Sequence, residues 1–125
     1  MPQVLLVAFG GAIGSVLRYY VGRWSLRLMG PSFPWGTLAV NVAGCFVIGV
    51  FAEIIARRFN ASEELRLLLI TGFLGGFTTF SAFSLDAISL FERGALSAAA
   101  VYVVASVGLS MLAVVAGLAL TRALI

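Results

Sequence analysis

Four long runs of mostly apolar residues, separated by short polar segments, dominate the pattern along the chain. A helix needs about 20 apolar residues to cross a bilayer, and each run is close to that length. The sequence therefore predicts four membrane-spanning helices, at residues 4–21 or 4–29, 35–56, 65–91 and 96–120.

The segments between these runs carry turn and charge signals. "GPSFPWG", at residues 30–36, has two prolines and a glycine at each end, which is typical of a loop. "ARRFNASEELR", at residues 56–66, holds much of the charge, and either Asn60 or Ser62 is placed to cap the next helix. "ERG", at residues 92–94, is expected to close the third span.

Composition supports a membrane protein with no separate soluble domain. The 125 residues are 62% hydrophobic and 10% charged, whereas soluble domains are about 45–50% apolar and about 25% charged. The first run lacks the basic region and cleavage site of a signal peptide, so we expect it to remain as a permanent span. We predict one all-α integral membrane domain over residues 1–125.

Arginines are divided evenly between the two ends of the predicted spans, and the chain has no lysine. Lys and Arg near span ends decide orientation. An even division allows two interpretations: one orientation that the count does not reveal, or dual topology, with opposite copies paired in an antiparallel, self-complementary homodimer. One side holds Arg57, Arg58, Arg66 and Arg122, and the other holds Arg18, Arg23, Arg27 and Arg93.

Several kinds of chemistry are excluded by the residues that the chain lacks. It has one cysteine, Cys45, and no histidine. A transition-metal site is therefore not expected, and a histidine-dependent catalytic triad is impossible. No phosphate-binding loop motif is present. We expect Cys45 to be a small buried apolar residue, and we expect neither an enzyme nor a nucleic-acid partner.

A few polar side chains lie deep inside the predicted spans. Asn41 is well inside the second, where an amide serves either as glue between helices or as part of a wet pathway. Tyr102, Ser106 and Ser110 are spaced four apart in the fourth, so they share one stripe of that helix. The stripe indicates either a wet track or hydroxyls bonded back to carbonyls one turn earlier.

The third span contains its own helix breaker, in "TGFLGGFTTFSAFSLD" at residues 71–86. Gly72, Gly75 and Gly76 precede a pair of threonines, and glycine costs a helix about 1 kcal/mol relative to alanine. A break frees carbonyls and amides, which is tolerated at membrane depth only in protein, water or contact with an ion. The segment therefore predicts a mid-membrane break and an ion site.

Phenylalanines recur directly after the break, interleaved with hydroxyls. A lipid-facing or packing stripe explains such a run. Ring edges carry partial positive charge and can also meet a small anion without trapping it. No acidic residue lies in the middle of the first, second or fourth span, which argues against a proton or cation relay and favours an anion. The rings are Phe73, Phe77, Phe80 and Phe83, and the hydroxyls are Thr79, Ser81 and Ser84.

Three segments together resemble the signature segments of the Fluc, or CrcB-type, fluoride channels. They are "GGAIGSVLRY" (residues 10–19), "WGTLAVNVAGCFVIG" (35–49) and the segment at 71–86. The resemblance extends over almost the whole chain. It implies a dual-topology homodimer in the bacterial inner membrane, with two antiparallel pores that export fluoride passively and so give fluoride resistance.

The resemblance also implies roles for particular residues. Asn41 would contact the permeating ion, and Phe80 and Phe83 from opposite subunits would present their ring edges to it. Backbone carbonyls of Gly75 and Thr78 would hold a structural Na⁺ at the dimer interface. The family's polar track would comprise Ser81, Tyr102, Ser106 and Ser110.

Three further positions bear on the resemblance. Arg18 would lie in the vestibule, although snorkelling at a span end explains it nearly as well. Asp86 stands where relatives often have Glu, and Ala82 stands where they often have Thr, which removes one hydroxyl from the track.

Two other functions fit a short four-span chain. A small multidrug exporter needs a glutamate in its first span, and residues 4–21 contain none. A non-conducting assembly subunit would use its polar stripe only to hold helices together.

Overall fold

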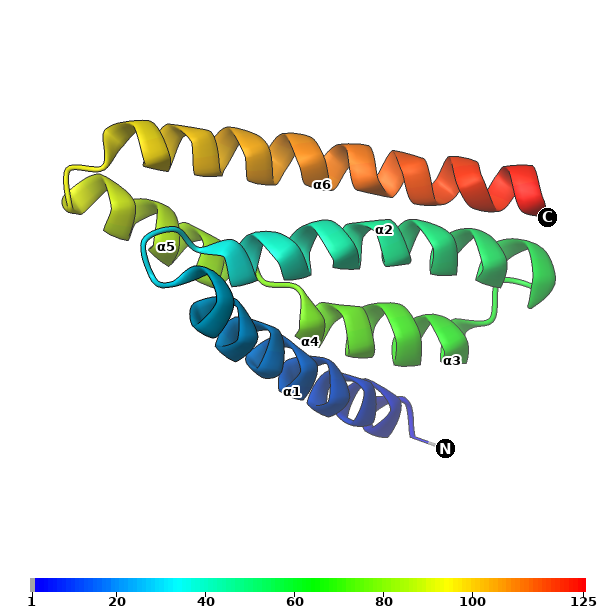
Figure 1. The fold of residues 1–125 in the computed structure, drawn as a ribbon. Helices are drawn as coiled ribbons and strands as arrows, with labels where there is room; N and C mark the ends of the chain where they lie inside the picture. Colours follow the sequence, from blue (N-terminus) through cyan, green and yellow to red (C-terminus); the bar gives the residue numbers. More distant parts are fainter. Residues whose placement is uncertain (1) are drawn as a thin grey trace.

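The computed structural model describes residues 2–125, and their regular structure is helical throughout (Figure 1). Four helical stretches are long and apolar enough to cross a membrane, with the third counted over Glu63–Glu92. This confirms the prediction of an all-helical chain with four spans. The elements are α1 (Gln3–Met29), α2 (Trp35–Arg58), α3 (Glu63–Leu65), η1 (Arg66–Leu74), α4 (Gly75–Phe77), α5 (Phe80–Glu92) and α6 (Leu96–Leu124).

Helix ends follow the local signals of the sequence. Gly30 (φ 77°) ends α1 and Gly94 (φ 82°) follows α5, both in the left-handed region that glycine tolerates. Ser62 caps the third span by accepting a hydrogen bond from the Leu65 amide at 3.3 Å. Asn60 instead has a positive φ of 54° in the turn, so of the two candidate caps Ser62 is the one used.

After the short α3, the third span continues as a π-helix rather than an α-helix. η1 runs for nine residues, Arg66–Leu74, before α4 resumes α-helical geometry. π-helical turns are rare and occur frequently at functional sites. Nothing in the sequence pattern predicted this wider winding, which directly precedes the break.

Glycines allow two helix pairs to approach closely. A Cβ at Gly14 would overlap the Phe73 carbonyl of η1, and a Cβ at Gly117 of α6 would overlap the Phe46 carbonyl of α2. Small residues are used in this way between membrane helices, so these glycines serve helix packing. At Gly22 and Gly108 an added Cβ would meet nothing within 4 Å among the described residues, so these two do not serve packing within the chain.

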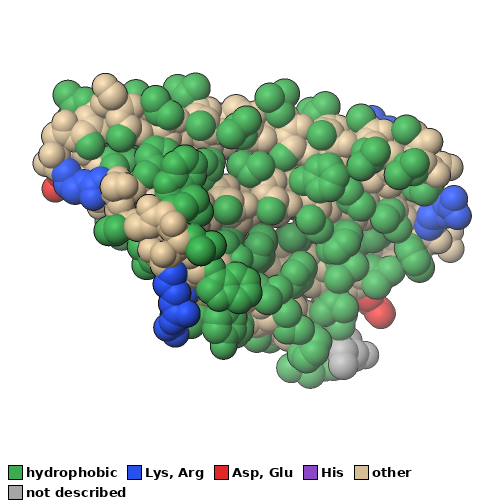
Figure 2. Space-filling model, in the orientation of Figure 1, with side chains coloured by type: hydrophobic (Ala, Val, Ile, Leu, Met, Phe, Trp, Pro, Cys, Tyr) green, Lys and Arg blue, Asp and Glu red, His purple; other side chains and the backbone are tan. Residues whose placement is uncertain are grey.

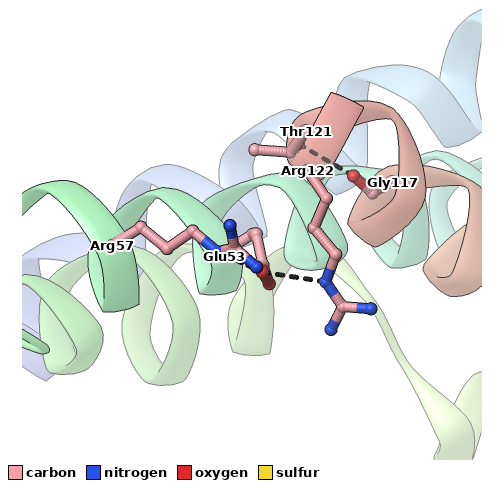
Figure 3. Close-up of polar contacts among 5 residues, drawn as sticks. All are labelled: Glu53, Arg57, Gly117, Thr121 and Arg122. Atoms are coloured by element: carbon pink, nitrogen blue, oxygen red, sulfur yellow. Dashed lines mark hydrogen bonds and ion pairs between the residues drawn. The ribbon is translucent and has the colours of Figure 1, made fainter. Parts of the chain in front are cut away.

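A charged cluster ties α2 to α6 near the ends of both helices (Figure 3). The Glu53 Oε1 atom accepts hydrogen bonds from Nε of Arg57 and Nε of Arg122, each at 2.8 Å. Beside it, the Thr121 hydroxyl donates to the Gly117 carbonyl at 2.8 Å. Glu53 is only 8% exposed, and its two guanidinium partners make that burial tolerable.

Charged side chains gather near the two ends of the molecule, and the surface between them is apolar (Figure 2). The buried core is small, since Tyr102 and Val40 are the only large side chains that are fully buried among residues 2–125. A chain with its apolar surface outward and its charges at the ends is a multi-pass membrane protein.

Candidate functional site

The third span is interrupted between α4 and α5. Thr78 (φ −90°, ψ 162°) and Thr79 (φ −156°, ψ 123°) are both extended. The Thr79 hydroxyl then caps α5 by accepting a hydrogen bond from the Ala82 amide at 3.1 Å. Glycines before the break and a capping threonine after it therefore produce the discontinuity that the sequence predicted in this span.

Asn41 of α2 holds the extended segment in place. Its Nδ2 atom donates to the Thr79 carbonyl at 3.0 Å, and its Oδ1 atom accepts from the Thr79 amide at 2.8 Å. One side chain thus bonds to both the amide and the carbonyl of Thr79, in the middle of the break. An amide nitrogen carries two hydrogens, so one remains for another partner. The glue interpretation of Asn41 is correct for these bonds, and they leave the residue free to face a ligand.

The bonds of Asn41 also affect the carbonyls at the end of α4. In a continuous helix the Thr79 amide would donate to the Gly75 carbonyl, four residues earlier. Here it donates to Asn41 instead. The neighbouring carbonyls of Leu74 and Gly76 receive hydrogen bonds from Thr78 and from Arg18. The break therefore leaves the Gly75 carbonyl without its helical donor.

A pocket of about 310 Å³ lies beside the break. It brings together side chains from α2, α5 and α6 that are far apart in the sequence. Its walls include five of the residues predicted for the ion pathway, together with the cysteine: Asn41, Cys45, Phe80, Phe83, Ser106 and Ser110. Two other predicted residues, Ser81 and Tyr102, do not line it.

Ser106 has the least satisfied polar group of this pocket. The residue is only 5% exposed, and its Oγ atom has no hydrogen-bond partner among the described residues. The alternative that this hydroxyl bonds back to a carbonyl one turn earlier is therefore wrong for Ser106. Thr78 and Ser84 do make such back-bonds, at 2.8 and 3.0 Å. A buried hydroxyl without a partner costs about 1–3 kcal/mol, which makes Ser106 the candidate ligand-binding group of this pocket.

Two phenylalanines form an aromatic wall next to Ser106. The rings of Phe80 and Phe83 lie 5.5 Å apart at 50°. Phe83 is 9% exposed and Phe80 is 77% exposed, so the second ring projects from the surface of the chain. The earlier rings, Phe73 and Phe77, stack on each other at 6.2 Å, so the break divides the phenylalanine run into two separate pairs.

Asp86 forms a polar junction between α2, α5 and α6. Its Oδ2 atom accepts hydrogen bonds from the Thr37 hydroxyl at 2.8 Å and from the Tyr102 hydroxyl at 3.2 Å. The sequence singled out Asp86 only as a departure from the family pattern, and Thr37 was missed. A threonine one turn before Asn41 was the available signal, because residues four apart share a helix face.

A second cavity, of about 480 Å³, lies on the other side of Thr79, which lines both. Three arginines, Arg18, Arg23 and Arg93, line it together with Asp86. The Nε atom of Arg18 donates to the Gly76 carbonyl at 3.0 Å, so Arg18 binds the end of α4 as well as lining the cavity. Snorkelling of a side chain at a span end therefore does not fully explain the position of Arg18.

The remaining predicted site residues lie around these two cavities. Ser81 is exposed, and its Oγ atom lies 3.2 Å from the Thr79 hydroxyl in a shared hydrogen bond. Tyr102 is fully buried. Cys45, expected to be a small buried apolar residue, is only partly buried and lines the smaller pocket.

Fold and site together define a multi-pass helical membrane protein with a polar pocket at a helix break. Residues 5–118 match the family described as CrcB-like protein, Camphor Resistance (CrcB). The chain is 83% identical to the fluoride-specific ion channel FluC of Rhizobium leguminosarum bv. trifolii over 124 residues, 99% of each chain. It is 66% identical to the channel of the same name from Agrobacterium fabrum over 122 residues, 98% of each. The chain belongs to the CrcB family, which confirms the resemblance seen in the sequence.

Proposed function

We propose that this protein is a fluoride-selective channel, and that the smaller pocket is part of its pathway for F⁻. Relatives that share 83% and 66% of its residues are named fluoride-specific ion channels. The observation in this chain that carries the proposal is the buried, unpaired hydroxyl of Ser106 beside the Asn41 amide. No charged side chain lines this pocket among the described residues.

The chemistry of the pocket suits a small, strongly hydrated anion. Fluoride holds water tightly, so a selective pathway must replace that water with hydrogen-bond donors. The free Nδ2 hydrogen of Asn41 and the hydroxyls of Ser106 and Ser110 serve as donors. Ring edges of Phe80 and Phe83 add weak positive potential without a full charge that would trap the ion. Closely spaced hard donors favour fluoride over the larger chloride.

The polar track continues from this pocket to the larger cavity. Thr79 lines both cavities. Ser81 bonds to the Thr79 hydroxyl, and Tyr102 bonds to Asp86, which also lines the larger cavity. We assign this cavity, with Arg18 in its wall, as the vestibule. Its three arginines raise the local concentration of anions.

The functional unit is an antiparallel, dual-topology homodimer with two pores. A single chain buries few large side chains and leaves Phe80 77% exposed, so the open side of the pocket requires a second copy. The even division of arginines between the two ends permits insertion in both orientations. In the dimer, each pathway is lined by Phe80 and Phe83 from opposite subunits, and the helix break lies at mid-membrane.

A structural Na⁺ at the dimer interface fits the carbonyls of the break. Gly75 lacks its helical donor because the Thr79 amide bonds to Asn41, and Thr78 is extended. Backbone carbonyls are hard oxygen ligands, which suit a hard cation. The Gly75 and Thr78 carbonyls would bind the ion. Its charge would then stabilise the contact between the helix breaks of the two subunits.

Transport is passive and outward across the bacterial plasma membrane. A negative interior drives an anion out by about 2.3 kcal/mol per charge per 100 mV. The channel therefore protects the cell from fluoride without an enzymatic energy source.

Purified protein in liposomes tests the proposal directly. It is expected to release fluoride and retain chloride, and equal rates for the two ions would contradict selectivity. A multidrug exporter would instead move cationic drugs, although α1 contains no Asp or Glu to couple them to protons. An assembly subunit would move none of these. A reporter fused to the C-terminus should give signal on both sides of the membrane, and a one-sided signal would exclude dual topology.

A further inference from the structure

Both sulfur atoms of the central part of the bundle face the same pocket. Cys45 of α2 and Met111 of α6 both line it, together with Ser106. Cys45 lies one helical turn after Asn41, and Met111 directly follows Ser110. The chain has one cysteine and no histidine, so the second soft ligand in this pocket is a thioether from another helix.

The hydroxyl of Ser106, which has no partner among the described residues, indicates that this pocket receives a ligand. Ser106 is only 5% exposed, and its Oγ atom has no hydrogen-bond partner among the described residues. The pocket therefore offers one thiol, one thioether and one free oxygen. Thiolate and thioether are the ligands that select soft cations such as Cu(I).

We propose that Cys45 and Met111 form a binding site for a soft monovalent cation, of the Cu(I) and Ag(I) class, which blocks the channel. On binding, the Cys45 thiol gives its proton to water and its sulfur bonds to the metal. The resulting thiolate–metal pair is neutral, so no net charge is buried. The blocking consequence rests on the proposed function, because it assumes that fluoride passes through this pocket. The metal site itself does not depend on that assumption.

The same chemistry separates this site from the proposed sodium site. Carbonyl oxygens at Gly75 and Thr78 are hard ligands, whereas sulfur is soft. A soft cation therefore binds at the sulfur pair rather than at the carbonyls, and excess Na⁺ does not displace it. Silver nitrate is the probe of choice, in nitrate buffers, because chloride would precipitate silver.

Silver retained by the full-length purified protein after gel filtration tests the site. Wild type is expected to retain about one Ag⁺ per chain, and Met29→Leu, at the exposed end of α1, should match it. Cys45→Ser should retain almost none, and Met111→Leu should retain several-fold less at limiting silver. Equal retention by Cys45→Ser would overturn the site, and equal retention by Met111→Leu would overturn the pair. As a measurement without mutation, Ag⁺ should protect wild-type Cys45 from maleimide, and unchanged labelling would also overturn the site.

Fluoride efflux from liposomes tests the block. For each variant, the rate in the presence of silver is compared with the rate of the same variant without silver. Efflux through wild type and Met29→Leu should stop in Ag⁺, and efflux through Cys45→Ser should not change. Bound silver with undiminished efflux would overturn the block. Absence of fluoride efflux before silver is added would instead contradict the proposed function, and silver retention would still decide the metal site.

Discussion

Two polar clusters contain residues of both α2 and α6, and they differ in whether their hydrogen bonds are complete. Near the helix ends, Glu53 accepts from two arginines and the Thr121 hydroxyl donates to the Gly117 carbonyl (Figure 3). In the pocket at the break, the Ser106 hydroxyl is about as buried but has no hydrogen-bond partner within residues 2–125. Membrane-buried polar groups that serve only structure find partners within the protein. A buried group without a partner is a candidate to bind a ligand or water.

Asn41 both makes structural hydrogen bonds and offers a donor to the pocket, so its loss should have the largest effect. Asn41→Ala removes both bonds to Thr79 and the donor that faces the pocket. Fluoride efflux is expected to fall at least about 100-fold, the equivalent of roughly 2.7 kcal/mol in a rate. Efflux from liposomes measures this, with gel filtration to verify assembly.

Asn41→Asp is the matched control for that prediction. It keeps the oxygen that accepts from Thr79 but replaces the donor with negative charge, so it should assemble better than Asn41→Ala and still block an anion. Normal efflux through either variant would contradict the role of Asn41 in the pathway.

The aromatic wall should give the next largest effect. Phe80→Ile or Phe83→Ile replaces a ring edge with an alkyl group of similar bulk, and fluoride efflux is expected to slow by about tenfold or more while assembly persists. Phe73→Ile serves as the control, because Phe73 stacks on Phe77 before the break and lies outside the pocket. If both wall variants conduct normally, the ring-edge explanation is wrong.

Local sequence signals predicted the parts of the fold that depend on neighbouring residues. Run length predicted the four spans, and glycine followed by threonine predicted the break, because chain conformation there is set within a few residues. Asn41 and Ser106 could be selected because a polar residue in an apolar helix is conspicuous.

Pairings between distant residues could not be predicted in this way. Arg122 meets Glu53 across 69 positions, and Thr37 meets Asp86 across 49. The π-helical winding of η1 and the side of Cys45 that faces the pocket also depend on how the helices pack. Each of these requires the relative rotation of helices, which hydrophobic runs alone do not specify in a span that is apolar all round.

Removing one hydroxyl from each of the two polar clusters tests directly whether one cluster is structural and the other functional. Ser106→Ala removes an unpaired buried group, so stability should stay the same or rise by up to about 1 kcal/mol while fluoride efflux falls several-fold. Thr121→Ala removes a bond to the Gly117 carbonyl, so stability should fall by about 0.5–1.5 kcal/mol with efflux unchanged. Thermal unfolding in detergent and liposome efflux measure the two quantities. Loss of stability in Ser106→Ala would mean that its hydroxyl is structural after all.

Neutralising Glu53 should have the smallest effect on transport. Glu53→Gln keeps the shape of the side chain but removes the charge between Arg57 and Arg122. Both arginine side chains are about half exposed, at 51% and 55%, so water replaces part of the lost interaction and the loss of stability should be small. Efflux per assembled channel should stay within about twofold of wild type, because neither cavity is lined by Glu53. A large fall in efflux with normal stability would show that the Glu53 cluster acts on the pathway through α2, although its hydrogen bonds are complete. Complete hydrogen bonding would then no longer distinguish structural polar groups from functional ones in this protein.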